Sequence, residues 1–368
     1  MKATLSRLNL TALLTKIQNI TPAKPVAPIL GSLLLEAQND ELIISATDGT
    51  VSMRIYTEAK VAEEGAIALP ARQFIQLIRE LTAPIVEIHT SPADLCHINS
   101  GASHFKLKGM LKQEFPEMPD LGEASGFSIN AKELKETLAR STFSAARSDT
   151  QNLLNAIYLE STPNSTFVMT TDGKRLSKIP FSAALGLQAE HSCLIPLKAA
   201  EEVIHILDTK EEDPITVKMQ ADKIGFEMKA ITLVTKLFSG QYPDVGRIIP
   251  KAAQEALQLH REELISLLRQ VCLFTSEHHP SVRFSFNPGE LAISINAPNV
   301  GEGVVRMPVN YAGQALNIAF NPVYFLDVLK HIKDETVLLS LTDSYNPGLI
   351  TDSTSAQFVI MPMRLENV

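Results

Sequence analysis

Four groups of side chains in this sequence have the residue types that catalysis, metal binding or phosphate binding uses. Paired carboxylates can exchange protons with a substrate, neighbouring histidines can ligate a metal, and closely spaced glycines can cradle a phosphate. The four groups are Asp48 with Asp172, Glu114 with Glu117, His278 with His279, and the segment Gly301-Glu302-Gly303.

Each of these groups has a simpler structural explanation. Asp48 and Asp172 are both followed by glycine between alternating apolar residues, which is typical of a hairpin turn whose two central residues take positive φ. Adjacent histidines on a strand or loop point in different directions, no helix pattern closely follows the glycines, and the two glutamates flank a Phe-Pro turn. The sequence also lacks the patterns G-x-x-x-x-G-K-[ST], G-x-S-x-G and H-E-x-x-H. We therefore expect no catalytic residue, no metal site and no cofactor.

The composition is that of a globular chain. Of the 368 residues, 45% are hydrophobic and 20% are charged, with a net charge of −8, and this length predicts two or three domains. No apolar run is long enough to span a membrane, and the N-terminal segment lacks the apolar core of a signal peptide. Cys96, Cys193 and Cys272 are too far apart for a disulfide framework or a metal motif, so we expect buried thiols in a reducing cytoplasm.

The clearest internal repeat is a helix introduced by proline. Pro70, Pro196 and Pro322 are each 126 residues apart, and proline suits the first turn of a helix, where its missing N–H is not needed. Apolar residues follow at helical spacing, as between Phe74 and Leu81. The spacing predicts helices over 70–81, 195–207 and 320–333.

Two further kinds of segment recur along the chain. A strand, an Asp-Gly turn and a second strand are predicted over 42–55 and 167–179, and a looser copy surrounds Asn296, 124 residues beyond Asp172. An amphipathic helix opens each copy, capped by residues such as Asn9 or Asn130. These opening helices are expected over 8–20, 131–143 and 261–274.

The repeats divide the chain into three similar units of about 120 residues, at 1–124, 125–250 and 251–368. Segments rich in turn-forming residues, EFPEMPDLGEASG and QYPDVGRIIPKAAQ, close the first two units. Between its two helices each unit carries short alternating strands, so we expect an α+β fold with mainly antiparallel sheets. Units of this length are too long for a solenoid and favour pseudo-symmetric domains around an axis.

Charge is distributed unevenly between the predicted helices and the rest of the chain. The six helices with their flanks carry +6 in total, which leaves −14 for the remainder. A basic surface attracts phosphates without reading bases, and an acidic exterior repels other DNA. Ordinary exposed helix faces produce the same pattern, so charge alone leaves both interpretations open.

Four segments carry a resemblance to a known family. They are PVAPILGSLLLEA from Pro25, TTDGKRL from Thr170, YPDVGRIIP from Tyr242 and FVIMPMRL from Phe358. In this order and at this spacing they closely resemble the bacterial DNA polymerase III beta subunit, the DNA sliding clamp, over essentially the whole chain. The run MPMRL is highly specific for that family, whereas Asp-Gly hairpins alone are not.

The resemblance implies that each unit is a DNA-clamp domain, with antiparallel sheets outside and paired helices inside. Two protomers would join head to tail as a homodimer, a closed ring of six domains around double-stranded DNA. Such a ring holds DNA topologically and without sequence specificity, so weak and salt-sensitive contact is compatible with long retention. The implied partners are the DNA polymerase III alpha subunit, the clamp-loader complex, and other polymerases and repair proteins that carry a clamp-binding peptide.

In that family the partner peptides bind a groove between the second and third domains. Here the matching residues would form an apolar pocket with Arg175 and Arg247 at its rim, and an exposed Met-x-Met adapts to several partners. The set comprises Leu154, Thr171, Gly173, Lys174, Arg175, Leu176, Pro243, Arg247, Ile248, His279, Asn321, Tyr324, Val359, Ile360, Met361, Pro362, Met363, Arg364 and Leu365.

Three features depart from the family pattern. His279 stands where the family often has an aromatic residue, and Lys174 where it commonly has histidine. The segment 366–368 extends past the usual terminal leucine, beside the groove. These differences bear on the specificity and strength of peptide binding rather than on the general function.

Two further sets of residues follow from pattern and family position. The alternating segment HFKLKGML, from His104, predicts an edge strand that is prone to pair with another chain. Across that dimer junction, Leu273 and Phe274 are expected to pack against Phe105 and Leu107. The residues expected to face the hole and contact phosphate are Lys24, Arg72, Arg79, Arg147 and Lys198.

Two other classes of function remain open on the sequence alone. The first is an adaptor or scaffold built of clamp domains that is not loaded on DNA, which loader-dependent retention on circular DNA would distinguish. The second is an enzyme with an unfamiliar site, whose turnover would be lost on mutating a pocket acid.

Overall fold

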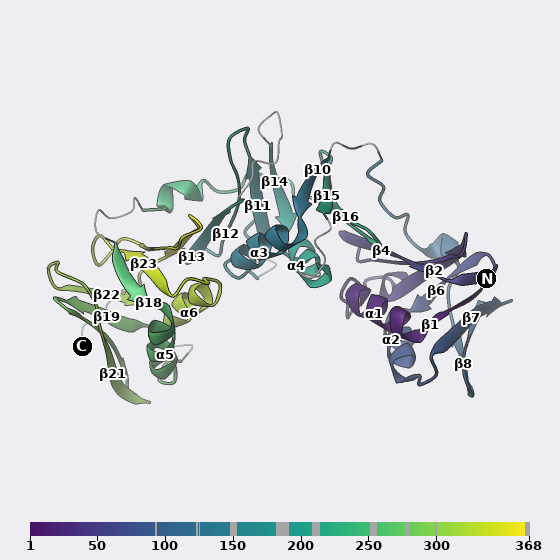
Figure 1. The fold of residues 1–368 in the computed structure, drawn as a ribbon, viewed down its shortest axis with the longest axis horizontal. Helices are drawn as coiled ribbons and strands as arrows, with labels where there is room; N and C mark the ends of the chain where they lie inside the picture. The colour runs from purple at the N-terminus through teal and green to yellow at the C-terminus, as the bar shows by residue number, and fades with distance from the viewer. Residues whose placement is uncertain are drawn as a thin grey trace. The chain divides into compact units, whose positions relative to one another are not determined.

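In a computed structural model, the chain is described over residues 1–92, 94–122, 124, 126–147, 153–181, 191–207, 214–250, 256–276, 280–298 and 300–364. These residues form two compact units (Figure 1). Unit 1 combines Met1–Lys135 with Lys198–Leu237, and unit 2 combines Glu136–Leu197 with Phe238–Val368. The central part of the sequence therefore contributes to both units.

Unit 1 is built on two antiparallel sheets. Its strands are β1 (Lys2–Ser6), β2 (Ser32–Gln38), β3 (Glu41–Thr47), β4 (Val51–Glu58), β5 (Lys60–Glu63), β6 (Gly65–Pro70), β7 (Ile85–Ser91), β8 (Leu95–Ser100), β9 (Ser103–Lys108), β10 (Gly126–Asn130), β15 (Pro214–Met219), β16 (Lys223–Met228) and β17 (Ile231–Lys236). The smaller sheet has the order β5-β1-β7-β8-β9, and the larger has the order β10-β15-β16-β17-β4-β3-β2-β6.

The helices of unit 1 bury one apolar face each. Helix α1 (Arg7–Ile17) packs against α2 (Ala71–Glu80) and buries Leu10, Leu14 and Ile17, which recur at helical spacing. Helices α3 (Ala131–Thr142) and α4 (Leu197–Ile206) are divided between the units. Two 3₁₀ turns, η1 (Pro28–Gly31) and η2 (Lys112–Glu114), complete the elements of unit 1.

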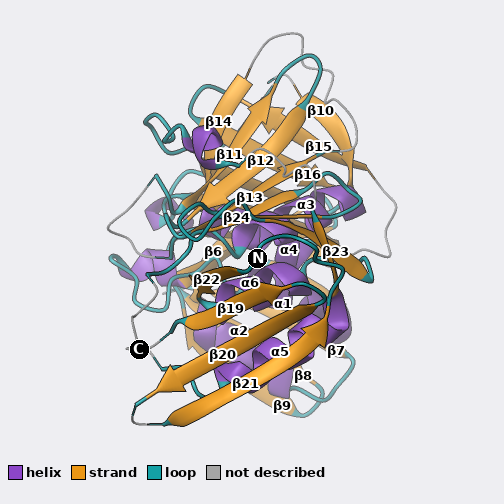
Figure 2. Ribbon diagram, turned by 90° about the vertical axis from the view of Figure 1, so that its left-hand side faces the viewer, coloured by secondary structure: helices purple, strands orange, loops and turns teal. Residues whose placement is uncertain are grey.

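Unit 2 also contains two antiparallel sheets. Its strands are β11 (Ala156–Ser161), β12 (Thr166–Thr171), β13 (Arg175–Pro180), β14 (His191–Pro196), β18 (Leu257–His260), β19 (Val282–Asn287), β20 (Glu290–Ala297), β21 (Gly301–Pro308), β22 (Leu316–Phe320), β23 (Thr336–Ser340), β24 (Gly348–Thr351) and β25 (Gln357–Ile360). One sheet has the order β14-β11-β12-β13-β25-β24-β23-β18. The other has the order β21-β20-β19-β22, and Figure 2 shows β21 along its edge.

Helices α5 (Arg261–Cys272) and α6 (Pro322–Lys330) pack together in unit 2, and a 3₁₀ turn η3 (Val245–Ile248) lies in the linker before them. The core of this region is aromatic: Phe284 lies 5.0 Å from Phe325 and 5.5 Å from Phe320, measured between ring centroids. These rings are almost fully buried. Their packing fixes α6 against its sheet, and α6 carries the expected groove residue Tyr324 and is capped by another, Asn321.

All six helices predicted from the sequence are present, with two corrections at their ends. Asn130 accepts backbone N–H bonds at the start of α3, as expected, but α1 is capped by Ser6 rather than by Asn9. Ser6 has an extended backbone and its hydroxyl accepts the N–H of Asn9, which is the geometry of an N-cap. Among the three prolines only Pro322 begins its helix, whereas Pro70 and Pro196 end the preceding strands.

Both Asp-Gly hairpins are present, but the expected turn geometry is wrong in one respect. Gly49 and Gly173 have φ of 93° and 82°, whereas Asp48 and Asp172 do not take positive φ. Instead, Oδ1 of each aspartate accepts the backbone N–H groups two and three residues further on, at 2.8 to 3.0 Å. Hydrogen bonds from the backbone to the aspartate carboxylate therefore stabilise each turn, and only the glycine takes the positive φ that was expected at both central residues. In the third copy Asn296 lies within β20.

Each eight-stranded sheet joins strands that are far apart in the sequence. In unit 1, β4 pairs with β17 and places Ser52 opposite Val234; we call this the first seam. In unit 2, β13 pairs with β25 and places Leu176 opposite Val359; we call this the second seam. Ser52 and Leu176 each follow a turn aspartate by four residues, so they hold the same place in the repeat.

Candidate functional site

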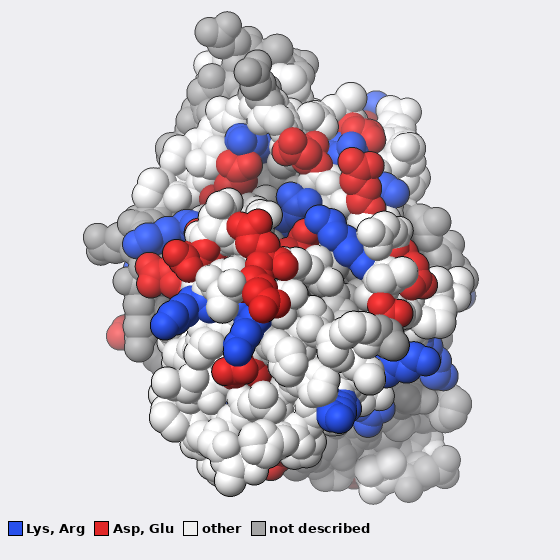
Figure 3. Space-filling view, turned by 90° about the vertical axis from the view of Figure 1, so that its right-hand side faces the viewer, with Lys and Arg blue, Asp and Glu red and all other residues white. Residues whose placement is uncertain are grey.

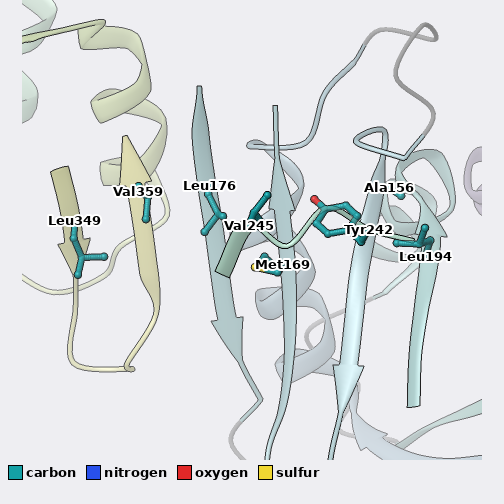
Figure 4. Packing of buried hydrophobic residues seen from close by; sticks show 8 residues of the cluster. All are labelled: Ala156, Met169, Leu176, Leu194, Tyr242, Val245, Leu349 and Val359. Atoms are coloured by element: carbon teal, nitrogen blue, oxygen red, sulfur yellow. The ribbon is translucent and has the colours of Figure 1, made fainter. Parts of the chain in front are cut away.

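A cluster of buried apolar side chains covers one face of the second seam (Figure 4). Leu176 and Val359, which pair across the seam, are only 4% and 1% exposed. Leu154 is partly buried and packs against the same cluster. Its buried members are Ala156, Met169, Leu176, Leu194, Tyr242, Val245, Leu349 and Val359.

The linker that enters η3 closes part of this cluster. Tyr242 and Val245 are buried in it, and the ring of Tyr242 stacks on Tyr158 with 5.1 Å between the centroids. Burial raises the pKa of Tyr242 well above its usual value, so the phenol stays protonated. These two side chains therefore fix the linker against the sheet.

The same linker leaves other side chains at the surface. Ile248 is 44% exposed, and Pro243 and Arg247 are exposed as well. Arg247 pairs with Asp244 at 2.6 Å, and both side chains remain largely in solvent. An apolar side chain and a cation are thus exposed within three residues of Val245, a member of the buried apolar cluster.

The backbone of the Met-Pro-Met run is bonded at two places in unit 2, beside β13 and on β22. The N–H of Met361 donates to the carbonyl of Lys174 at 2.9 Å, and the N–H of Met363 donates to the carbonyl of Ala319 at 2.7 Å. The three side chains of this run are half-buried, and Arg364 is exposed. The backbone therefore holds Met361 beside the second seam and Met363 beside β22. His279, Leu365 and the segment 366–368 lie outside the described residues.

The turn between β12 and β13 is fixed by its own polar groups. The hydroxyl of Thr171 donates to the carbonyl of Arg175 at 2.6 Å and accepts the N–H of Gly173 at 3.0 Å. Gly173 and Lys174 are exposed, and a side chain at position 173 would meet no atom within 4 Å. This turn is therefore a rigid and accessible edge of the candidate groove.

Arg175 lies inside unit 2 rather than free at the rim. Its three nitrogen atoms donate to Asp172 at 3.1 Å, to Asp327 at 2.6 Å and to the carbonyl of Phe143 at 2.7 Å. The guanidinium also lies over the rings of Phe143 and Tyr324, and the side chain is 13% exposed. Because side chains alternate along a strand, Arg175 faces away from its neighbour Leu176 in the cluster.

Helix α6 supplies the acidic partner, which sequence reasoning missed. Asn321 caps the helix by accepting the N–H of Val323 at 3.0 Å, and the ring of Tyr324 lies 4.7 Å from the Arg175 guanidinium. Asp327 is three residues beyond Tyr324, so the two share a helix face. That spacing is the one sequence signal from which Asp327 could have been found.

The basic residues expected to face DNA lie on open surface, with one exception described below. Lys24, Arg72 and Arg147 are exposed. Arg79 is also exposed, although its guanidinium donates to Gln18 at 2.7 Å. On the face drawn in Figure 3, acidic and basic side chains are interspersed, so that face is not a uniform basic patch.

Lys198 is the exception in exposure: it is half-buried, and its ammonium is ion-paired within unit 1. Its ammonium lies 2.5 Å from Oδ2 of Asp48 and 3.3 Å from the carbonyl of Ile20. Further along α4, His205 lies 3.2 Å from the carbonyl of Thr15, and burial raises the pKa of Glu202. Asp48 and Asp172 thus have the same role: Oδ1 of each closes its turn, and Oδ2 binds a cation, Lys198 or Arg175 respectively. The sequence did not reveal this role.

The residues expected at the dimer junction lie beside unpaired sheet edges. Phe105 and Leu107 belong to β9, an edge strand of unit 1, and Phe105 is 44% exposed. Leu273 follows α5 and is 79% exposed. Phe274 is half-buried beside Gly301, where the edge strand β21 begins. The two groups therefore have surfaces that another chain can cover.

Over the described residues, no group of three or more His, Cys, Asp or Glu side chains is arranged to hold a metal ion. Burial raises the pKa of Cys96 and Cys193 to about 12, so these thiols stay protonated at neutral pH. No helix within the described ranges has the length and apolar character that a membrane span needs.

Comparison with known families assigns this chain along its length. Three family models match in order: the N-terminal domain of the DNA polymerase III beta subunit over residues 1–119, the central domain over 128–244 and the C-terminal domain over 246–364. The chain therefore belongs to the DNA polymerase III beta subunit family.

Individual relatives agree with this assignment. The beta sliding clamp of Chlamydia pneumoniae is 46% identical over 367 residues, which is 100% of both chains. That of Escherichia coli K12 is 30% identical over 372 residues, 99% of this chain and 100% of its own. The crystal structure of the Pseudomonas aeruginosa sliding clamp bound to griselimycin has a TM-score of 0.93 at 27% identity, covering 99% of this chain and 100% of that one. The predicted fold of three tandem clamp domains is confirmed.

Proposed function

We propose that the chain is a DNA sliding clamp and processivity factor without a catalytic site of its own. It encircles duplex DNA and tethers the replicative polymerase, the clamp loader and repair proteins through peptides that they carry. Membership of the beta subunit family supports the class of function. The second seam supports the tether, because it combines a buried apolar cluster with exposed apolar side chains.

The observation that carries this proposal is the surface formed at the second seam. Ile248 is 44% exposed, and Met361 and Met363 are half-buried although their backbone is held by hydrogen bonds. A Leu or Phe side chain of a partner peptide would bury this surface, with the methionines adjusting to its shape. Arg247 at the edge would bind a backbone carbonyl or an acidic side chain.

The ring is proposed from the unpaired edges of the two units. Strand β9 ends one sheet and β21 ends another, and exposed apolar residues lie at or near both. In a head-to-tail homodimer, Phe105 and Leu107 of one protomer meet Leu273 and Phe274 of its partner at each of two junctions. The exposed basic residues Lys24, Arg72, Arg79 and Arg147, together with Lys198, would then contact phosphate without reading bases.

Retention on DNA of different topology tests the function as a whole. A bacterial clamp loader with ATP should place the protein on nicked circular DNA, where it survives a salt wash. Cutting the circle should release it, because only topology holds it there. Equal retention before and after cutting would show ordinary binding and contradict the proposal. Griselimycin binding without any loading would favour the alternative, an adaptor built of clamp domains.

The groove is tested by removing a side chain that the protomer itself does not bury. Ile248→Ala should weaken griselimycin about fivefold, because about 44% of a side chain worth roughly 1.5–3 kcal/mol when fully buried is available to the ligand. Met363→Ala should also weaken griselimycin binding, because it removes the methionine side chain. The backbone bond from this position to Ala319 is retained, so the effect reports the side chain alone. The matched control is Leu338→Ala, because Leu338 is 40% exposed and lies on β23, two strands from the seam. Equal affinities for all variants, measured by calorimetry, would place the groove elsewhere.

A further inference from the structure

An ion pair links the start of β13 to helix α6 on the face opposite the apolar cluster. Nη1 of Arg175 lies 2.6 Å from Oδ2 of Asp327, and the two side chains are 13% and 24% exposed. Oδ1 of Asp327 lies 3.4 Å from Lys330, so the carboxylate is held from two sides. Neither residue of this ion pair belongs to the cluster.

The backbone on either side of Arg175 forms the candidate groove. The carbonyl of Lys174 accepts the N–H of Met361, and Leu176 pairs with Val359 across the second seam. A displacement of Arg175 would therefore move both the Met-Pro-Met run and the paired residues of the cluster.

The surroundings of Arg175 make its position depend on Asp327. The guanidinium is mostly buried, and each of its nitrogen atoms has one acceptor within the chain. Removing the charge of Asp327 leaves a buried cation short of one anionic partner, which is unfavourable in a site with little access to water. The start of β13 would then adopt other arrangements to solvate the guanidinium.

We propose that Asp327 and Arg175 are positioning residues for the groove: they hold the second seam in the arrangement that binds a peptide, without contacting the peptide. This inference rests on the proposed function. If only a fraction of the molecules is in the binding arrangement, the apparent affinity falls by that fraction. The association rate falls with it, whereas the dissociation rate of the bound complex is unchanged.

The test compares binding kinetics of griselimycin with the full-length parent and Asp327→Asn. The variant should associate about three- to tenfold more slowly and dissociate at the parental rate. Ile248→Ala, which removes a contact, should instead speed dissociation. Glu136→Gln is the control, because it removes an exposed ion pair with Lys333 in the same unit and should change neither rate. Asp327→Glu should restore much of the association rate.

The outcomes separate the inference from the proposed function. Failure of the parent to bind griselimycin would overturn both. If the parent binds, unchanged kinetics for Asp327→Asn, or faster dissociation alone, would overturn only the inference. Thermal melting establishes that the variant is folded at the assay temperature. If Asp327→Asn does not fold, Arg175→Lys replaces it, since it keeps the charge but cannot reach three acceptors, and it should show the same slower association.

Discussion

Leu273→Ala tests the proposed ring junction, because a second protomer would bury this side chain there. The side chain is 79% exposed in one protomer, so its removal should leave the protomer core intact. Burying a leucine fully contributes roughly 1.5–3 kcal/mol, and the exposed share corresponds to about 1–2 kcal/mol. A head-to-tail dimer contains two equivalent junctions, so the dimer should lose about 3 kcal/mol, or roughly a hundredfold in dissociation constant.

Sedimentation velocity over a dilution series measures this change directly. The parent should sediment at twice the mass of one chain to lower concentrations than Leu273→Ala, and the two should melt at similar temperatures once both are monomeric. Leu8→Ala is the matched control, because Leu8 is 66% exposed and belongs to α1 rather than to either edge strand. If the two leucine variants dissociate at the same concentration, Leu273 is not at the junction.

Two further changes have expected outcomes. Lys24→Ala should lower the slope of log affinity for duplex DNA against log salt by up to about one. Lys198→Ala should lower that slope less, because Asp48 already binds the Lys198 ammonium. Equal changes in slope for the two variants, measured by fluorescence anisotropy, would contradict this ranking. Burial lowers the pKa of His331 below its ordinary value of 6.5, so the unfolded chain binds the proton at a higher pH than the folded chain does. The contribution of the neutral ring to stability is therefore fully present above pH 6.5 and should decline as the pH falls toward the lowered folded pKa. Thermal melting between pH 5 and 8 should show a flatter profile for His331→Gln, and an unchanged profile would remove His331 as the cause.

Local patterns in the sequence predicted the elements of this fold well. The helices follow from apolar residues at helical spacing, as with Leu10, Leu14 and Ile17 in α1. The hairpins follow from Asp-Gly between alternating residues, although the aspartate closes the turn through its side chain. The seams were not predictable in this way, because β4 pairs with a strand about 180 residues away and both partners are ordinary short strands.

The candidate site shows the same division between local and distant information. The family resemblance named Leu154, Leu176 and Val359, and the structure brings them together in one cluster. The resemblance did not indicate that Arg175 and Lys198 form ion pairs with Asp327 and Asp48 of the same chain. From sequence alone, any Lys or Arg predicted to be exposed is a candidate to bind a partner or DNA. Only the tertiary fold shows whether a carboxylate of the same chain already binds it.

The repeat places an equivalent of the proposed groove at the first seam, and side chains there differ in a way that predicts one peptide site per chain. The linkers 118–122 and 242–246 read Met-Pro-Asp-Leu-Gly and Tyr-Pro-Asp-Val-Gly at the same place in the repeat. At the first seam, however, Ser52 stands in the position of Leu176, and a cavity of ≈ 120 Å³ there is lined by Arg54, Tyr56 and Glu227 among others. A Leu or Phe anchor placed there would cover polar groups without replacing their hydrogen bonds to water, which is unfavourable. We therefore expect apolar peptides to bind at the second seam alone, so that the proposed ring of two protomers would offer two sites rather than four.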